Sequence, residues 1–315
     1  MSDVSKILVK VSILIPVYNR EEFIGECIQS ALDQTYNEFE VIVVDNASTD
    51  RTWDVCQQFA SKDDRVKIFR NTFNVGPVRN WRRCFDEAVG MYGKILFSDD
   101  LMHSQCLEKT LPYIEDPEVG FVFSAVNIGI SPESSRINYQ WQASSCKITS
   151  NKFVESTYLG GMTPISPGAA LFRMADLRNN LRLEIPSPSF HDFSDHGAGP
   201  DLLLYLLTAR QYRLIAYVNE PLVFFRMHEE SISIRESGEF ISSRYRQARI
   251  WFASVGDDIA LLHRILVKTW VGECIRRRGF LSFRKVASKY LENPPEISFF
   301  KIVGVVISEA FHGKV

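Results

Sequence analysis

Two adjacent aspartates, Asp99 and Asp100, have the clearest potential for chemistry in this 315-residue sequence. They follow a short apolar run at residues 94–97, which is typical of a buried strand in a parallel sheet. Open α/β sheets bind their ligands at the carboxyl ends of such strands. Two neighbouring carboxylates favour a cation, and a Mg²⁺ or Mn²⁺ ion carried by a diphosphate suits them. An ordinary turn before a helix near His103 explains the same pair, so further residues are needed to distinguish the two interpretations.

The elements that position this pair follow an alternating pattern. Strand-like runs occur at residues 11–17, 39–44, 66–69 and 94–97. Helical periodicity occurs between them, at residues 21–32, 53–60 and 78–89. This alternation predicts a mostly parallel sheet with right-handed crossovers.

Polar residues follow three of these four strands. Tyr18 and Asn19 come after the first strand, residues 45–50 after the second, and the aspartate pair after the fourth. The carboxyl ends of parallel strands share one edge of a sheet, so we expect these residues to converge on one crevice.

The pattern becomes less regular beyond this point. We expect strands at residues 120–126, 169–172, 213–218 and 222–225, helices at 104–114, 153–159 and 202–210, and a long surface loop at 131–150. Asp201 directly precedes the leucine-rich helix, so a role as N-cap or first-turn residue is its default interpretation. From Gly238 onward only helices are expected, at residues 241–252, 259–275 and 283–290.

The composition excludes several classes of protein. A net charge of −2 gives no basic face for nucleic acid. The six cysteines form no CxxC pair, which indicates reduced thiols rather than a zinc site or a disulfide framework. No apolar run reaches the length of a membrane span, and the first ten residues lack a signal-peptide core. We therefore expect a cytoplasmic protein, and leave open a peripheral contact of its C-terminal helices with the cytoplasmic face of a membrane.

Several motifs occur in an order that resembles glycosyltransferase family 2. The matching segments are VSILIPVYN at residues 11–19, VVDNASTD at 43–50, NVGPVRNW at 74–81, LFSDD at 96–100, GPD at 199–201 and FRMHEES at 225–231. Each segment alone is a weak signal, whereas their ordered combination over residues 10–232 is specific. Members of this family are inverting transferases that use sugar nucleotides.

The resemblance implies a GT-A-type fold, an α/β architecture with a doubly wound, mostly parallel sheet flanked by helices. We expect residues 1–130 to form its nucleotide-binding half and residues 131–235 its acceptor-binding half. Residues 236–315 lie outside the resemblance and are expected to form a helical extension.

The resemblance also implies roles for individual residues. The expected contacts of the nucleotide are Pro16, Tyr18, Asn19, Asp45, Arg79, Asn80 and Asp99. Asp99, Asp100 and His228 are the expected metal ligands, for Mn²⁺ or Mg²⁺. Phe97 replaces the first aspartate of the family's Asp-x-Asp motif, so which of the two remaining aspartates binds the metal stays open.

Asp201 matches the catalytic base of the family, with Asp195 and Asp192 as alternatives. A base must accept the proton of the acceptor hydroxyl as the new bond forms. A single base without a second, nucleophilic carboxylate predicts inversion at the anomeric carbon. The expected donor is a nucleoside-diphosphate sugar, with uridine as the default, and the expected acceptor is a glycan or glycolipid of surface polysaccharide synthesis.

Other functions of similar folds fit less well. A nucleotidyltransferase that makes sugar nucleotides usually has a Gly-rich basic loop after its first strand, and residues 16–19 lack one. An oxidoreductase that uses a dinucleotide would carry a GxGxxG segment there. A module that binds a nucleotide sugar without catalysis remains an alternative, which an assay of sugar-nucleotide hydrolysis distinguishes.

Overall fold

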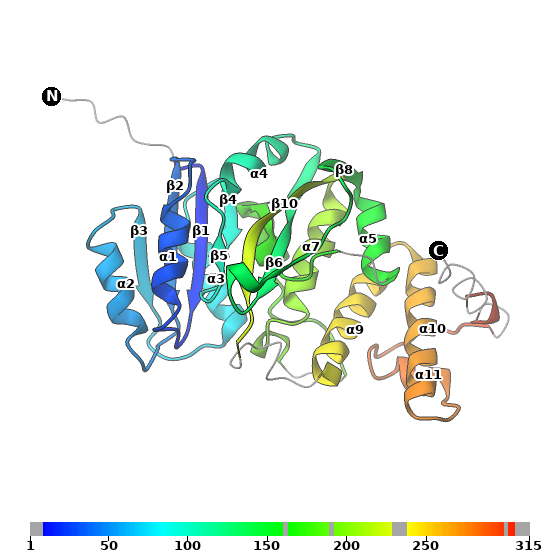
Figure 1. The fold of residues 1–315 in the computed structure, drawn as a ribbon. Coiled ribbons are helices and arrows are strands. Elements are labelled where there is room, and N and C mark those ends of the chain that lie inside the picture. The colour runs from blue at the N-terminus through cyan, green and yellow to red at the C-terminus, as the bar shows by residue number, and fades with distance from the viewer. Residues whose placement is uncertain (1–8, 160–162, 189–191, 229–237, 299–301, 306–315) are drawn as a thin grey trace. The chain divides into compact units, whose positions relative to one another are not determined.

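The computed structural model describes residues 9–159, 163–188, 192–228, 238–298 and 302–305 (Figure 1). The chain divides into two compact units. The first unit consists of Met1–Leu181 and Ser194–Arg235, and the second of Arg182–Phe193 and Glu236–Val315. All six cysteines are free thiols.

The first unit is built on one mixed sheet. Its strands are β1 (Val11–Val17), β2 (Phe39–Asp45), β3 (Val66–Arg70), β4 (Tyr92–Ile95), β5 (Leu101–Met102), β6 (Val119–Gly129), β7 (Arg136–Asn138), β8 (Cys146–Thr149), β9 (Ala170–Arg173) and β10 (Leu214–Arg226). The order across the sheet is β3-β2-β1-β4-β9-β6-β10-β5, with β7 beside β6 and β8 beside β10. The long pairings are parallel, between β3, β2, β1 and β4 and between β6 and β10.

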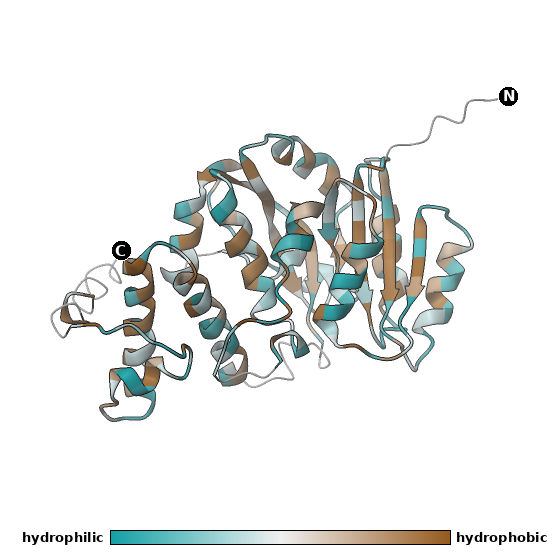
Figure 2. Ribbon diagram, turned by 180° about the vertical axis from the view of Figure 1, so that it is seen from behind, coloured by the Kyte–Doolittle hydropathy of each residue, from teal (hydrophilic) through white to brown (hydrophobic). Residues whose placement is uncertain are grey.

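Helices connect these strands and cover the sheet. They are α1 (Ile24–Leu32), α2 (Thr52–Ala60), α3 (Pro77–Glu87), α4 (Cys106–Ile114), α5 (Ser150–Leu159), α6 (Met174–Asn180) and α7 (Pro200–Gln211), with short 3₁₀ turns at Pro132–Ser134, Pro167–Ala169 and Phe193–Asp195. Every residue of β1 and β2 is buried, which explains their almost continuous apolar sequences. In Figure 2 the strands are accordingly mostly brown, whereas the helices alternate between brown and teal.

Three predicted elements differ from the structure. The strand before the aspartates ends at Ile95 rather than Phe97, because the amide of Asp100 turns back to the carbonyl of Phe97 at 2.9 Å. The strands expected at 213–218 and 222–225 are one strand, β10, whose register shifts on both sides of Pro221. The prediction of a loop at 131–150 was wrong in part, because this segment contains β7, which pairs with β6, and β8, which pairs with β10.

In the residues that the structure describes, the second unit contains three labelled helices and the irregular segment 182–188. Its helices are α9 (Gly238–Ser254), α10 (Ile259–Arg276) and α11 (Phe283–Ala287). Asp258 caps α10 by accepting the amide of Leu261 at 2.9 Å. Arg244, which is 2% exposed, donates to the carbonyl of Phe193 at 3.3 Å and so joins α9 to the segment Arg182–Phe193. Within the described ranges, no helix has the length and apolar character needed to cross a membrane.

Candidate active site

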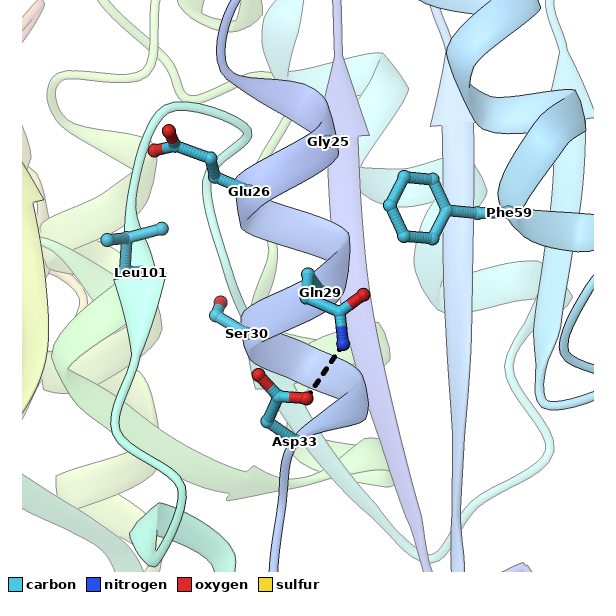
Figure 3. Close-up of a pocket in the computed structure, with 7 residues that line it drawn as sticks. All are labelled: Gly25, Glu26, Gln29, Ser30, Asp33, Phe59 and Leu101. Atoms are coloured by element: carbon cyan, nitrogen blue, oxygen red, sulfur yellow. Dashed lines mark hydrogen bonds between the residues drawn. The ribbon is translucent and has the colours of Figure 1, made fainter.

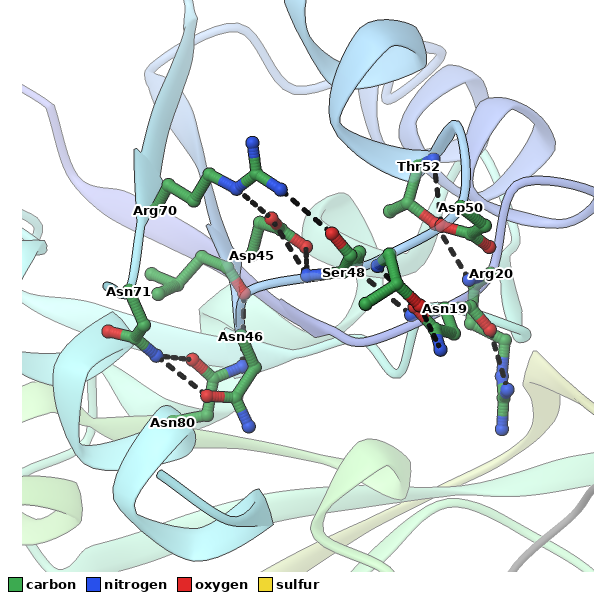
Figure 4. Close-up of polar contacts among 12 residues, drawn as sticks. Asn19, Arg20, Asp45, Asn46, Ser48, Asp50, Thr52, Arg70, Asn71 and Asn80 are labelled. Carbon is green, nitrogen blue, oxygen red and sulfur yellow. Dashed lines mark hydrogen bonds and ion pairs between the residues drawn. The ribbon is translucent and has the colours of Figure 1, made fainter. Parts of the chain in front are cut away.

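The polar residues that follow the strands are connected at one edge of the sheet. β1 lies between β2 and β4 and is parallel to both, so all three strands end on the same side. Asn19 links the first two ends, since its amide donates to Ser48 Oγ and its side-chain oxygen accepts the amide of Thr49, both at 2.9 Å. Arg20 Nε lies 3.7 Å from Asp99 Oδ2 and extends the connection to the third end. The predicted convergence is therefore observed, and Figure 4 shows the contacts between the first two ends.

Asp45 ends β2 and is completely buried. Its Oδ2 pairs with Arg70 Nε at 2.9 Å, and the amide of Ser48 donates to both carboxylate oxygens at 3.2 Å. Arg70 also donates to the carbonyl of Ser48 at 2.7 Å, and its guanidinium lies 5.4 Å from the centre of the Trp53 ring. Arg70 thereby holds both the carboxylate and the loop that follows β2 (Figure 4).

Three asparagines brace the neighbouring helix α3. The side-chain amide of Asn71 donates to the side-chain oxygens of Asn46 and Asn80, each at 2.9 Å. Asn80 in turn donates to the carbonyl of Val44 at 3.0 Å and is 2% exposed. Asn80 was expected to line the nucleotide pocket, and these bonds give its side chain a bracing role. Arg79, beside it, is half-buried on α3.

Of the other expected nucleotide contacts, Pro16 and Tyr18 lie on either side of the last residue of β1. Pro16 is buried within β1, opposite Val44 of β2. Tyr18 follows β1 and is 40% exposed. Tyr18 is thus the more accessible of the two to a ligand.

His228 and Asp99 lie together although 129 positions separate them. His228 Nε2 is 2.8 Å from Asp99 Oδ2. The antiparallel pairing of β5 with β10 brings this about, because Phe224 lies opposite Leu101 and the next residues of β10 therefore run alongside the aspartates. Arg226 adds two bonds of 3.0 Å, from its amide to Asp100 Oδ1 and from its Nε to the carbonyl of Asp99.

The two aspartates differ in their surroundings. The Asp99 side chain is 18% exposed and has cationic or imidazole neighbours in Arg20 and His228. Asp100 is 6% exposed, and burial, followed by the charge of Asp99, raises the pKa of its carboxyl well above the usual range. The backbone amide of Arg226 opposes this shift.

The donor set of this corner fits a hard divalent cation bound together with a substrate. Mg²⁺ is commonly held by one or two carboxylates plus phosphate oxygens, and Asp99 and Asp100 supply two carboxylates. His228 Nε2 is a further donor beside them. Across the described part of the chain, no group of three or more His, Cys, Asp or Glu side chains is arranged as a metal site by itself.

Asp201 lies in the first turn of α7 and is 7% exposed. Its Oδ1 accepts the amide of Gly199 at 2.8 Å and that of Leu202 at 2.6 Å. Gly199 has φ of +105°, a conformation that glycine adopts readily, so the helix begins with a sharp turn that fixes the carboxylate. The first-turn interpretation is thus correct, and a catalytic role is compatible with it.

Tyr139 is half-buried and packs against the cluster of Val126, Ala169 and Val223. Burial raises the pKa of the Tyr139 phenol, and the charges of Asp201 and Asp100 raise it further. The two alternative bases are placed differently. Asp195 is exposed at the end of a 3₁₀ turn, whereas Asp192 belongs to the second unit.

A separate pocket of 440 Å³ lies beside α1 and is open to solvent (Figure 3). Its lining residues are Gly25, Glu26, Gln29, Ser30, Asp33, Phe59 and Leu101. None of the predicted site residues is among them. Gln29 donates to Asp33 at 2.7 Å among these residues, and Glu26 pairs with Arg226 at 2.7 Å.

Sequence reasoning missed several residues of the site. Arg70 directly follows the third predicted strand, so the rule that singled out the other strand ends would have found it. Arg20 follows Asn19 in the same way. Arg226 directly follows the strand expected at 222–225, but its contact with the aspartates depends on the pairing of β10 with the two-residue strand β5, which no sequence pattern indicated.

Known proteins share this architecture. The solved structure of S. aureus TarS, residues 1–349 in complex with UDP-GlcNAc, superposes with a TM-score of 0.65 at 20% sequence identity, over 82% of this chain and 71% of that one. The expected GT-A-type fold is therefore confirmed.

Relatives in sequence carry glycosyltransferase names. TuaG of Bacillus subtilis, named as a teichuronic acid biosynthesis glycosyltransferase, is 25% identical over 261 residues, which are 82% of this chain and 92% of TuaG. A glycosyltransferase of Haemophilus influenzae is 36% identical over 104 residues, which are 33% of this chain and only 42% of that protein. The model of the family described as "Glycosyl transferase family 2" matches residues 12–180. More than half of the sequence is thus covered, and the chain belongs to glycosyl transferase family 2.

Proposed function

We propose that this protein transfers a sugar from a nucleoside-diphosphate sugar to an acceptor hydroxyl, with inversion at the anomeric carbon. The observation that carries the proposal is the single connected edge at which Asp45, Asp99 and Asp100 lie, with Arg20 and Asn19 between them. One end of this edge suits a nucleoside and the other a diphosphate. Membership of glycosyl transferase family 2 supports the transferase chemistry.

The nucleoside binds at the ends of β1 and β2. Asp45 accepts hydrogen bonds from the base or the ribose, and Arg70 keeps its carboxylate oriented for this. Tyr18 offers an accessible ring beside the base. Uridine is the proposed nucleoside, and the S. aureus TarS complex with UDP-GlcNAc, which has the same fold, supports that choice.

The diphosphate binds beside Asp99 and Asp100. These carboxylates, with His228, hold Mn²⁺ or Mg²⁺ at the phosphate oxygens. The bound cation stabilises the negative charge that develops on the leaving diphosphate. Arg20, whose Nε lies 3.7 Å from Asp99 Oδ2, adds a positive charge to this end of the site.

Asp201 accepts the proton of the attacking hydroxyl. Its carboxylate is fixed by two backbone amides, which keeps it oriented. A single displacement with this base inverts the anomeric carbon. The proposed acceptor is a glycan or glycolipid of surface polysaccharide synthesis at the cytoplasmic face of the membrane. The name of TuaG, a relative over most of both chains, supports that class.

Donor binding is tested first. A thermal-shift screen of UDP-, GDP- and TDP-sugars with and without Mn²⁺ should show the largest rise in Tm for a UDP-sugar with Mn²⁺, since a ligand of the native state stabilises it. A rise that survives exhaustive chelation would contradict the metal role of Asp99 and Asp100.

The base is tested by substitution. Asp201→Asn should lower kcat for transfer by about 10³-fold while the donor dissociation constant stays within about twofold, because the general base acts only in the chemical step. Asp195→Asn is the matched control and should retain activity. Near-normal turnover of Asp201→Asn would overturn the assignment, and NMR of the product anomer tests inversion.

A further inference from the structure

The turn between α10 and α11 presents basic and apolar side chains together. From Cys274 to Leu291 the sequence has six Lys and Arg residues and no Asp or Glu. Two large apolar side chains in it are exposed, Ile275 by 71% and Phe280 by 85%. The exposed basic residues around them are Arg276, Arg277, Arg278, Arg284 and Lys285. We refer to these seven residues as the α10–α11 basic surface; Figure 1 labels the two helices.

Most of this positive charge is not neutralised by the protein. Glu273, whose side chain is 8% exposed, pairs with Arg276 at 2.6 Å and with Arg277 at 3.6 Å, and Arg276 also pairs with Glu239. The structure shows no carboxylate partner, within the ranges it describes, for Arg278, Arg284 or Lys285. Uncompensated cations are therefore adjacent to exposed apolar groups.

Contacts of Trp270 on α10 stabilise this turn. Trp270 on α10 donates its indole N–H to the carbonyl of Leu281 at 2.7 Å. Its ring meets Phe280 and Phe283 edge-on, at centroid distances of 5.5 Å and 6.3 Å. Phe280 thus contacts the Trp270 ring while most of its side chain stays exposed.

Arg278 occupies a position that normally favours glycine. Its φ is +50°, at the left-handed residue that ends α10, and Gly279 comes only after it. An arginine there is less favourable for folding than a glycine. The sequence therefore retains a positive charge in the turn against the local backbone preference.

We propose that the α10–α11 basic surface binds an anionic lipid membrane from one side. Elements that lie at a membrane interface combine Lys and Arg with aromatic or aliphatic side chains that enter the headgroup region. Phe280 and Ile275 supply the apolar part, and the five basic residues match the negative charge of the lipids. An interfacial contact of this kind needs no membrane-crossing helix.

Other occupants match the surface less well. A second copy of this surface would bring two sets of unpaired cations face to face. A soluble polyanion such as RNA would neutralise the arginines, but it offers little apolar surface to cover the aliphatic side chain of Ile275. The vesicle experiment distinguishes these two occupants from a membrane.

The experiment is vesicle flotation with the full chain. Vesicles of phosphatidylcholine with about 30 mol% phosphatidylglycerol should retain the protein, and pure phosphatidylcholine vesicles should not. Retention should fall as NaCl rises from about 0.1 M to about 0.5 M, because salt screens the attraction. The combined variant Arg277→Glu, Arg278→Glu and Arg284→Glu should lower vesicle affinity by at least about a hundredfold. Phe280→Ser should lower it about tenfold.

Two matched variants keep the test independent of folding. Arg278→Gly removes one charge at a site where glycine is favoured, so it should lower vesicle affinity about fivefold without lowering Tm. Lys62→Glu with Lys67→Glu changes two exposed lysines of the first unit and should leave retention unchanged. Equal retention of the wild type and the triple variant would overturn the proposal. So would a monodisperse dimer that the triple variant abolishes, or tighter binding to single-stranded RNA than to the vesicles.

Discussion

Asp45 is a buried carboxylate whose protein partners already define its orientation. Arg70 pairs with its Oδ2, and the amide of Ser48 donates to both of its carboxylate oxygens. Arg70 itself is 41% exposed, so it is a positioning residue at the border of the proposed nucleoside site. Loss of Arg70 should therefore weaken donor binding because the Asp45 carboxylate is no longer held in its orientation.

Arg70→Gln should therefore weaken donor binding about fivefold and leave kcat nearly unchanged. The substitution removes a charge-assisted hydrogen bond that solvent partly screens. Titration of the protein with UDP, followed by calorimetry, measures the affinity. Arg213→Gln is the control, because Arg213 forms a comparable pair with Glu118 on the surface and is 70% exposed. A loss of kcat without a loss of affinity would show that Arg70 acts elsewhere.

A site residue could be predicted from the sequence when it directly follows a strand that the sequence pattern reveals. Asp45, Asn19 and Asp99 each follow a strand that the sequence pattern reveals, so their convergence was predictable from the rule for parallel sheets. The contact between His228 and Asp99 instead depends on a pairing that periodicity does not encode. A two-residue strand such as β5 is too short to leave a periodic signal.

At the scale of elements, the amino ends of β1, β2 and β4 are joined by a buried polar brace. Ser12 Oγ donates to Glu40 Oε1 at 2.6 Å, and Gly90 donates its amide to Ser12 Oγ at 2.9 Å. A Cβ on Gly90 would lie 2.7 Å from the amide nitrogen of Ser12. The two backbones therefore approach closely only because residue 90 is glycine.

Gly90→Ala should destabilise the protein by about 2 kcal/mol, because the clash is with backbone that cannot rotate away. A fall in Tm of about 4–8 °C is expected by calorimetry. Gly25→Ala on α1 is the matched control. Its new Cβ would lie 3.7 Å from Val55, an ordinary contact, so Tm should stay the same or rise. Equal effects of the two substitutions would contradict the close approach.

The turn between α2 and β3 depends on a charged pair. Arg65 donates to Asp63 through Nη2 at 2.7 Å, and this bond lowers the pKa of the Asp63 carboxyl below its usual value. A lowered pKa in the folded state adds stability above the unfolded pKa of about 4, and this stability is lost as the pH falls through the folded value. The two side chains are 26% and 36% exposed, so the contribution is small.

Asp63→Asn should lower stability at pH 7 by roughly 0.5 kcal/mol and by less at pH 3, where the wild type is itself partly protonated. Urea unfolding at the two pH values measures this difference. Asp64→Asn changes an exposed neighbour and should have no effect at either pH. A penalty for Asp63→Asn that does not shrink on acidification would assign the effect to the turn backbone rather than to the charge.

Regular elements were predictable and irregular ones were not. The first four strands and three helices follow from periodicity, since each is long enough to repeat its pattern. β10 was predicted as two strands, at 213–218 and 222–225, whereas register shifts on both sides of Pro221 let one strand continue. Two of the three residues of β7 and two of the four residues of β8 are exposed, so no apolar pattern identified them.

At the scale of the whole molecule, the two proposed ligands act on different units. The nucleotide-sugar site consists of residues of the first unit, at the ends of β1, β2 and β10 and in the turn after β4. The α10–α11 basic surface consists of residues of the second unit. The two binding events should therefore leave separate protection patterns in the same chain.

Hydrogen exchange of the full chain, followed by mass spectrometry, tests this separation. UDP with Mn²⁺ should slow exchange in peptides that cover residues 17–20, 45–52 and 97–100, because the ligand suppresses local opening of the strand ends. Vesicles that contain phosphatidylglycerol should instead slow exchange in residues 275–285. Arg278→Gly should reduce only the second effect, and Arg70→Gln only the first. Equal protection of residues 275–285 by UDP and by vesicles would contradict independent sites and would show that the two units respond to one ligand together.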